Sequence, residues 1–128
     1  RLDGIGLEKL RRIGCQLMVV STEINPVVGE RCKKLRLECH QGVSNKGMFI
    51  KNYPWKAPRS STLTVFVGND ENDISAAAQV DLTICVADAH ESFLIHSDYV
   101  TTNSGGEGAV REICDHFFAL NNGECLND

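Results

Sequence analysis

The chain lacks the cysteine spacing of a metal ribbon or a redox motif, although its 128 residues include six cysteines. No two of these cysteines form a C-x-x-C pair, which such sites require. Most lie in apolar periodic segments, whereas a disulfide scaffold would be smaller and richer in loops. We therefore predict buried, reduced cysteines in a cytoplasmic protein. A site that uses Cys39 and His40 with distant partners is the minor alternative.

Positive charge and long apolar runs are also scarce. The formal net charge is -4, whereas a nucleic-acid surface needs clustered Lys and Arg to neutralise phosphates. The only basic cluster, at residues 33–36, is typical of a solvated helix face. No signal peptide or long apolar run is present. These absences predict a protein that binds neither nucleic acid nor a membrane.

Nucleotide-binding loops are missing as well. The glycine-rich stretch at residues 103–108 lacks the Lys-Ser/Thr that follows a P-loop, and its spacing is not G-x-G-x-x-G. An amphipathic helix is expected to follow it at residues 109–120, and amides at a helix N-terminus attract anions. An anion site and a plain connection both stay open.

The chain does contain enough apolar residues, 42%, for one compact domain. Its periodicity predicts strands at residues 16–21, 37–40, 63–67, 82–86 and 98–101, and helices at residues 5–13, from 26, at 72–79, 90–95 and 109–120. Such alternation predicts an α/β fold with a parallel sheet covered by helices. The prolines at 54 and 58 predict an irregular loop in which Trp55 covers the edge of the core or faces a partner.

The turn after the strand at residues 63–67 carries clustered oxygen donors. Asp70 and Asp73 are three residues apart there, and Asn69 precedes them. Oxygen donors at the end of a buried strand suit a hard cation such as Mg²⁺. The alternative is that all three side chains only cap the turn and the helix that follows. Spacing alone does not separate the two.

Six motifs follow one another in a distinctive order. They are Arg1-x-Asp3-Gly4-x-Gly6, Val20-Ser21-Thr22-Glu23-x-Asn25-Pro26-Val27-Val28, Gln41-Gly42-Val43-x-x-Lys46, Gly68-Asn69-Asp70-x-Asn72-Asp73, Ala87-Asp88-Ala89-His90 and Gly105-Gly106-x-Gly108-Ala109-Val110-Arg111-Glu112. This series resembles the haloacid dehalogenase superfamily, and within it the small cap-less phosphatases of 3-deoxy-octulosonate 8-phosphate and nonulosonate 9-phosphates. It also resembles the domain fused behind acylneuraminate cytidylyltransferases. The resemblance implies a Rossmann-like parallel sheet with helices on both faces.

The resemblance implies roles for individual residues. Ser21 would hold a phosphoryl oxygen, and Lys46 would neutralise the phosphoryl group as a point charge. Asp70 would ligate Mg²⁺, with Asn69 and Asp73 in the same turn, although many relatives carry Asp where this chain has Asn69. The alternatives are a capping Ser21 and a solvated Lys46.

The resemblance also implies a substrate and an assembly. Thr22 and Glu23 would bind substrate, and Glu23 replaces an Arg that is frequent in octulosonate phosphatases, which favours a sialic-acid-like sugar phosphate. In tetrameric relatives the segment that matches residues 105–111 lies near a neighbour's active site. A homotetramer is therefore expected, in which Arg111 reaches a substrate carboxylate. The alternative for Arg111 is a surface helix charge.

One part of the family pattern is absent. In the family, the nucleophile and the acid/base lie on an Asp-x-Asp-Gly strand upstream of the residues that match Arg1, and this chain has no such strand. We therefore expect residues 1–128 to be a domain that is incomplete at its N-terminus and lacks its first central strand. The leading hypothesis is a Mg²⁺-dependent phosphatase within a longer protein. The rivals are a catalytically silent module that oligomerises an acylneuraminate cytidylyltransferase, and a non-enzymatic sugar-phosphate binder.

Overall fold

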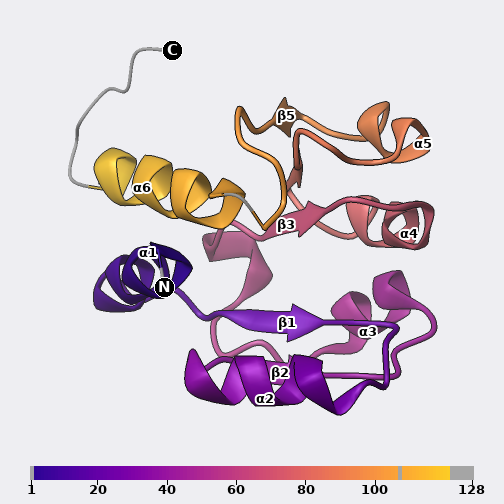
Figure 1. Cartoon of the computed structure of the whole chain (residues 1–128). Helices are drawn as coiled ribbons and strands as arrows, with labels where there is room; N and C mark the ends of the chain where they lie inside the picture. Colours follow the sequence, from indigo (N-terminus) through magenta and orange to yellow (C-terminus); the bar gives the residue numbers. More distant parts are fainter. Residues whose placement is uncertain (1, 107, 122–128) are drawn as a thin grey trace. The chain divides into compact units, whose positions relative to one another are not determined.

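A computed structural model describes residues 2–106 and 108–121 of the chain (Figure 1). These residues form two compact units, one from residues 1–42 and 106–128 and the other from residues 43–105. Both units contain parallel strands joined through helices, so that the predicted α/β class is confirmed. Among the described strands there are two separate sheets, one in each unit.

The first unit contains a two-stranded sheet and three helices. Its elements are α1 (Leu2–Arg12), β1 (Met18–Val20), α2 (Pro26–Lys34), β2 (Glu38–His40) and α6 (Ala109–Asn121). β1 pairs with β2 in parallel, with Val19 opposite Cys39. α2 begins as predicted, because the side chain of Asn25 accepts a hydrogen bond from the Val27 amide at 2.9 Å and Pro26 fills the first helical position.

The core of the first unit lies where α1 packs against α6 (Figure 1). Leu7, Leu10 and Cys114 are its buried centre. Partly buried apolar residues surround them: Ile13, Leu17, Leu35, Leu37, Val110 and Phe117. Both helices present apolar residues at helical spacing, and this packing confirms the amphipathic segments predicted near the two ends of the chain.

The second unit contains a three-stranded parallel sheet in the order β3-β4-β5. Its elements are α3 (Lys46–Asn52), η1 (Arg59–Ser61), β3 (Val65–Gly68), η2 (Glu71–Asp73), α4 (Ile74–Ala77), β4 (Leu82–Cys85), α5 (Glu91–Leu94) and β5 (Tyr99–Val100). Val67 lies opposite Ile84, and Cys85 opposite Val100. Phe93 is fully buried, and its ring meets that of Phe66 edge-on at a centroid distance of 6.3 Å.

Two segments of the second unit differ from the prediction. The helix expected at residues 72–79 begins as the 3-10 turn η2 and ends at Ala77, because side chains of the acidic turn cap its start. Helix α3 was not predicted. After it, the Trp55 indole donates to the Ile50 carbonyl at 3.1 Å, and its ring lies 4.7 Å from that of Tyr53. Trp55 therefore covers the end of α3.

The cysteine prediction is correct for part of the set. Cys32, Cys85 and Cys114 are free and buried, and Cys39 is free and half-buried. Cys15 is exposed, contrary to the prediction, because it follows the turn that ends α1. Cys125 lies outside the described residues.

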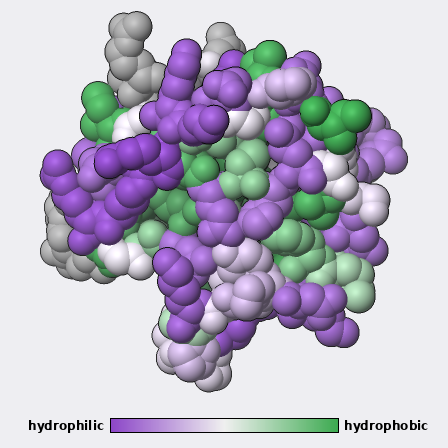
Figure 2. Space-filling model, turned by 90° about the horizontal axis from the view of Figure 1, so that it is seen from below, coloured by the Kyte–Doolittle hydropathy of each residue, from purple (hydrophilic) through white to green (hydrophobic). Residues whose placement is uncertain are grey.

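The surface is mostly hydrophilic on the face shown in Figure 2, where hydrophobic residues stand at separate places among hydrophilic ones. The most exposed large hydrophobic residues include Ile24 and Ile95, at 82% and 81% exposure. Of the helices that the structure describes, none combines the length and apolar composition needed to cross a membrane.

Candidate active site

A buried ion pair lies at the start of α3. The Lys46 ammonium nitrogen is 2.5 Å from Asp73 Oδ1, and only 8% of Lys46 and 2% of Asp73 is exposed. Lys46 is the first residue of α3, whose start is capped by Asn45 through a hydrogen bond from the Met48 amide at 3.0 Å. The alternative of a solvated Lys46 is therefore wrong. Burial of two opposite charges requires each to stay with its partner.

The second carboxylate oxygen of Asp73 organises the acidic turn. Asp73 Oδ2 accepts hydrogen bonds from the backbone amides of Asn69 at 2.9 Å and Asp70 at 3.1 Å. Gly68 permits this approach, because a Cβ atom there would lie 2.8 Å from Asp73 Oδ2 and 2.9 Å from the Phe93 ring. Asp73 thus joins Lys46 to the backbone of residues 69 and 70.

Helix α3 approaches α4 closely enough to fix Lys46 in place. A Cβ atom on Gly47 would lie 2.5 Å from the Ser75 carbonyl oxygen, so this contact requires glycine. The Gly47 amide also donates to the Ser75 hydroxyl at 3.1 Å. These contacts tie the first turn of α3 to the residues that follow Asp73.

Asn69 and Asp70 remain exposed at the carboxyl end of β3. Asp70 Oδ1 accepts a hydrogen bond from the Glu71 amide at 2.7 Å, which is the predicted capping role. The Asn69 carbonyl accepts from the His90 amide at 2.8 Å. Capping leaves the Asp70 carboxylate at the surface, and a carboxylate can accept at several positions. Asp70 therefore combines the two roles that the sequence left open: it caps the turn and stays accessible to a cation.

The predicted Ser21 site lies in the first unit, at the carboxyl end of β1. The Ser21 hydroxyl accepts a hydrogen bond from the Glu23 amide at 3.0 Å, and the Ser21 amide donates to the His40 carbonyl at 2.9 Å. The capping role weighed for Ser21 is therefore present. Glu23 is exposed, and Thr22 is half-buried between them. These three residues share one turn, while Lys46 and the acidic turn belong to the second unit.

Arg111 takes part in an ion-pair network that sequence analysis missed. Its Nε lies 2.9 Å from Asp115 Oδ2, and the Lys9 ammonium lies 2.9 Å from Asp115 Oδ1. Burial alone would raise the pKa of Asp115, but hydrogen bonds from Lys9 and Arg111 outweigh it and lower this pKa below its usual value. The spacing of Arg111 and Asp115, four residues apart on one helix, was the available signal.

The glycine-rich segment is anchored by a residue whose role was not predicted. The Gly105 amide donates to Asp88 Oδ1 at 2.8 Å, and the Ala87 amide donates to the Thr101 hydroxyl at 3.1 Å. Both bonds join the segments that follow β4 and β5. Glu107, within the predicted segment at residues 105–111, lies outside the described residues.

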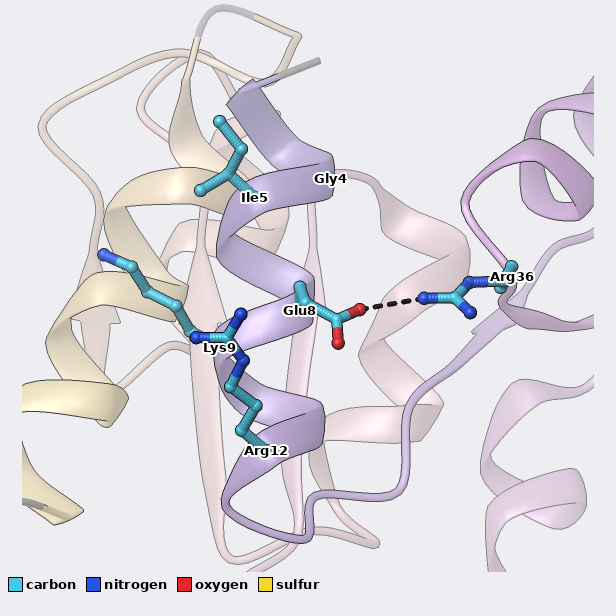
Figure 3. A pocket seen from close by; sticks show the side chains of 6 residues that line it. All are labelled: Gly4, Ile5, Glu8, Lys9, Arg12 and Arg36. Carbon is cyan, nitrogen blue, oxygen red and sulfur yellow. Dashed lines mark hydrogen bonds and ion pairs between the residues drawn. The ribbon is translucent and has the colours of Figure 1, made fainter.

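A pocket elsewhere in the first unit contains none of the predicted site residues. It lies between α1 and the turn before β2, and its lining residues are Gly4, Ile5, Glu8, Lys9, Arg12 and Arg36 (Figure 3). The Glu8 carboxylate is 3.0 Å from the Arg36 guanidinium. Because Glu8 already neutralises Arg36, this hollow is less suited to a phosphate than the Lys46 region is.

Comparison with known families assigns the class. The family model of haloacid dehalogenase-like hydrolases matches residues 30–113, and the chain therefore belongs to this family. The 3-deoxy-D-manno-octulosonate 8-phosphate phosphatase of Escherichia coli K12 is 32% identical over 88% of this chain and 61% of its own length. The Yersinia pestis phosphatase of the same name is 31% identical, with the same coverage. The chain thus spans 61% of the length of these curated relatives.

Solved structures agree with this assignment. A putative haloacid dehalogenase family hydrolase from Streptomyces avermitilis is 37% identical, with a TM-score of 0.80 over 90% of this chain and 71% of that one. The octulosonate phosphatase of Moraxella catarrhalis, in complex with magnesium, phosphate and its sugar product KDO, is 29% identical. Its TM-score is 0.79, with 95% of this chain and 75% of that chain covered. These likenesses confirm the fold.

Proposed function

We propose that this chain belongs to a Mg²⁺-dependent phosphatase that hydrolyses a phosphomonoester of a 3-deoxy sugar acid. The observation that carries the proposal is the buried Lys46–Asp73 pair, which lies beside the exposed carboxylate of Asp70. A fixed cation next to an accessible oxygen donor suits a phosphoryl group that is bound together with a metal ion. The octulosonate phosphatases among the relatives support the same substrate class.

Lys46 supplies the positive charge in this proposal. An ammonium has three N–H donors, so that its bond to Asp73 leaves donors for phosphoryl oxygens. Asp73 and the contact between Gly47 and Ser75 hold α3, and hence Lys46, in one position. A charge that is already positioned costs no reorganisation when negative charge develops on phosphorus.

The oxygen donors present fit Mg²⁺ as a partly hydrated ion. Mg²⁺ typically binds through one or two carboxylates while it keeps several waters. Asp70 offers an exposed carboxylate and Asn69 an exposed amide oxygen, and within the described residues no cluster of three His, Cys, Asp or Glu offers a fuller cage. Asp73, also predicted as a ligand, would have to share oxygens that already accept from Lys46 and two amides. When bound, Mg²⁺ would offset charge on the phosphoryl group.

We further propose that Ser21 hydrogen-bonds a phosphoryl oxygen, with Thr22 and Glu23 contacting the sugar. Glu23 is exposed, and its carbonyl is held by the Gly42 amide at 2.9 Å, which fixes the turn. An acidic side chain favours hydroxyl-rich over anionic parts of a substrate. This supports a sialic-acid-like sugar.

The acidic nucleophile is not among the residues of this chain, which contains no Asp-x-Asp-Gly sequence. The proposed phosphatase therefore takes its nucleophile from sequence preceding Arg1. The rival is a catalytically silent module of an acylneuraminate cytidylyltransferase, which Asn69 favours because an amide is a weaker Mg²⁺ ligand than a carboxylate. Phosphatase assays of the full-length protein separate the two, since the silent module gives no turnover.

We expect Asp70→Ala to weaken Mg²⁺ binding by roughly tenfold or more, because it removes a carboxylate ligand. Calorimetric titration of Mg²⁺ into the full-length protein measures the affinity. Glu71→Ala is the matched control, since Glu71 is an exposed acid in the same turn. If Asp70→Ala leaves both Mg²⁺ affinity and turnover at the wild-type level, the metal assignment is wrong.

We also propose that the protein is a cytoplasmic homotetramer in which Arg111 reaches the site of a neighbouring subunit. A cap-less domain has no lid of its own to exclude water, and a neighbour can supply one. Light scattering on the full-length protein should therefore give the mass of a tetramer.

Arg111→Ala should raise the KM for the sugar phosphate, while Arg12→Ala, an exposed arginine of α1, should not. A fully active monomer at micromolar concentration would contradict shared sites. An oligomer whose KM does not change in Arg111→Ala would exclude only the substrate role of Arg111.

A further inference from the structure

Two cysteine side chains of the first unit meet where α2 is followed by β2. Cys32 lies in the last turn of α2 and is only 4% exposed, whereas Cys39 is half-buried at the middle of β2. Their thiol groups are in hydrogen-bond contact. The Leu37 amide also donates to the Cys32 carbonyl at 2.8 Å, so that the chain turns back tightly between them. The fold therefore holds two free thiols against each other.

We propose that Cys32 and Cys39 are an oxidation site, at which a small disulfide such as oxidised glutathione converts the two thiols into an internal disulfide. Disulfide geometry requires the two sulfurs to approach to about 2.05 Å and the residues to come from adjacent backbone segments. The contact between the thiols meets the second condition. The short connection at residues 33–38 keeps the two thiols together before any oxidant arrives.

The exchange proceeds in two balanced steps. The thiolate of Cys39, the more accessible of the two, attacks one sulfur of oxidised glutathione and releases one glutathione thiolate. The thiolate of Cys32 then attacks the Cys39 sulfur of this mixed disulfide and releases the second glutathione. Overall the protein loses two protons and two electrons, and oxidised glutathione becomes two molecules of glutathione.

The second step is expected to be slow at neutral pH. Burial raises the pKa of Cys32 to about 11, the adjacent Cys39 raises it further, and Arg31 opposes both. Only the thiolate attacks a disulfide, so closure should accelerate by roughly tenfold for each pH unit up to that pKa. The mixed disulfide at Cys39 should therefore accumulate first and disappear as the pH rises.

Mass spectrometry of the purified chain tests this site directly. The chain is incubated with oxidised glutathione, quenched with acid, alkylated and digested with trypsin. Trypsin cleaves after Lys33, Lys34 and Arg36, so that the disulfide joins two peptides that otherwise separate. The expected product is this linked pair, which lacks two hydrogens and disappears on reduction.

Two variants control the experiment. Cys32→Ser should stop the reaction at the glutathione adduct of Cys39, whereas Cys15→Ser, which removes an exposed cysteine of the same unit, should leave the linked peptides unchanged. The proposal is overturned if Cys32 and Cys39 of the wild-type chain both remain alkylated, or each carries a separate glutathione, at saturating oxidant and alkaline pH.

Discussion

Lys46→Met in the full-length protein is expected to lower kcat for a phosphomonoester by about 10²–10³-fold, the loss typical of one preorganised charge or donor at a reacting oxygen. Met keeps most of the length and apolar stem of Lys46 but removes the ammonium 2.5 Å from Asp73. Steady-state phosphate release measures the effect. Because the charge acts on the phosphoryl group, affinity for inorganic phosphate should fall together with kcat.

The control must separate lost chemistry from lost folding. Lys46→Met leaves the Asp73 carboxylate buried without its cation, so circular dichroism has to show a wild-type spectrum before turnover is interpreted. Lys51→Met is the matched substitution, since Lys51 is an exposed lysine of the same helix. Wild-type turnover and phosphate affinity in a folded Lys46→Met variant would mean that Lys46 only neutralises Asp73.

Asp73→Ala is expected to lower the free energy of unfolding by about 3–5 kcal/mol, the cost of leaving one member of a buried ion pair without its partner. It would also leave the amides of Asn69 and Asp70 without their acceptor. Urea denaturation of the purified chain, followed by circular dichroism, measures this change.

Asp70→Ala is the control for Asp73→Ala, because Asp70 lies in the same turn but is exposed and only caps the Glu71 amide. Its cost should stay within the range of a lost cap, about 0.5–2 kcal/mol. Asp73→Asn keeps an oxygen for the two amides and should fall between the two. The ion pair contributes nothing to stability if Asp73→Ala costs no more than Asp70→Ala.

A double variant tests whether the pair acts as a unit. With both Lys46→Met and Asp73→Ala, no buried charge remains uncompensated, so the combined cost should be smaller than the sum of the single costs. The same coupling has a functional side in the proposed phosphatase. Asp73 binds the Lys46 ammonium with one oxygen and the backbone of the Asp70 turn with the other. It would therefore set the spacing between the phosphate-binding charge and the metal-binding turn.

Local sequence determined the elements whose signals lie within a few residues. The apolar spacing of residues 5–13 and 109–120 predicted α1 and α6, and Asn25 with Pro26 predicted the start of α2. The alternation of strands and helices predicted the parallel pairing. The ordered motifs indicated the family that the comparison confirmed over residues 30–113.

Tertiary structure decided which partner each charged side chain takes. Helix α3 begins with Lys46 and Gly47, and its periodicity is too short to identify it, but its packing against Ser75 holds it in place. Lys46 then meets Asp73, 27 residues away in the sequence. Likewise, Asp115 collects Lys9 from the far end of the chain as well as the neighbouring Arg111. Local propensity carries no information about contacts across such separations, because they form only when the packed helices and strands bring the side chains together.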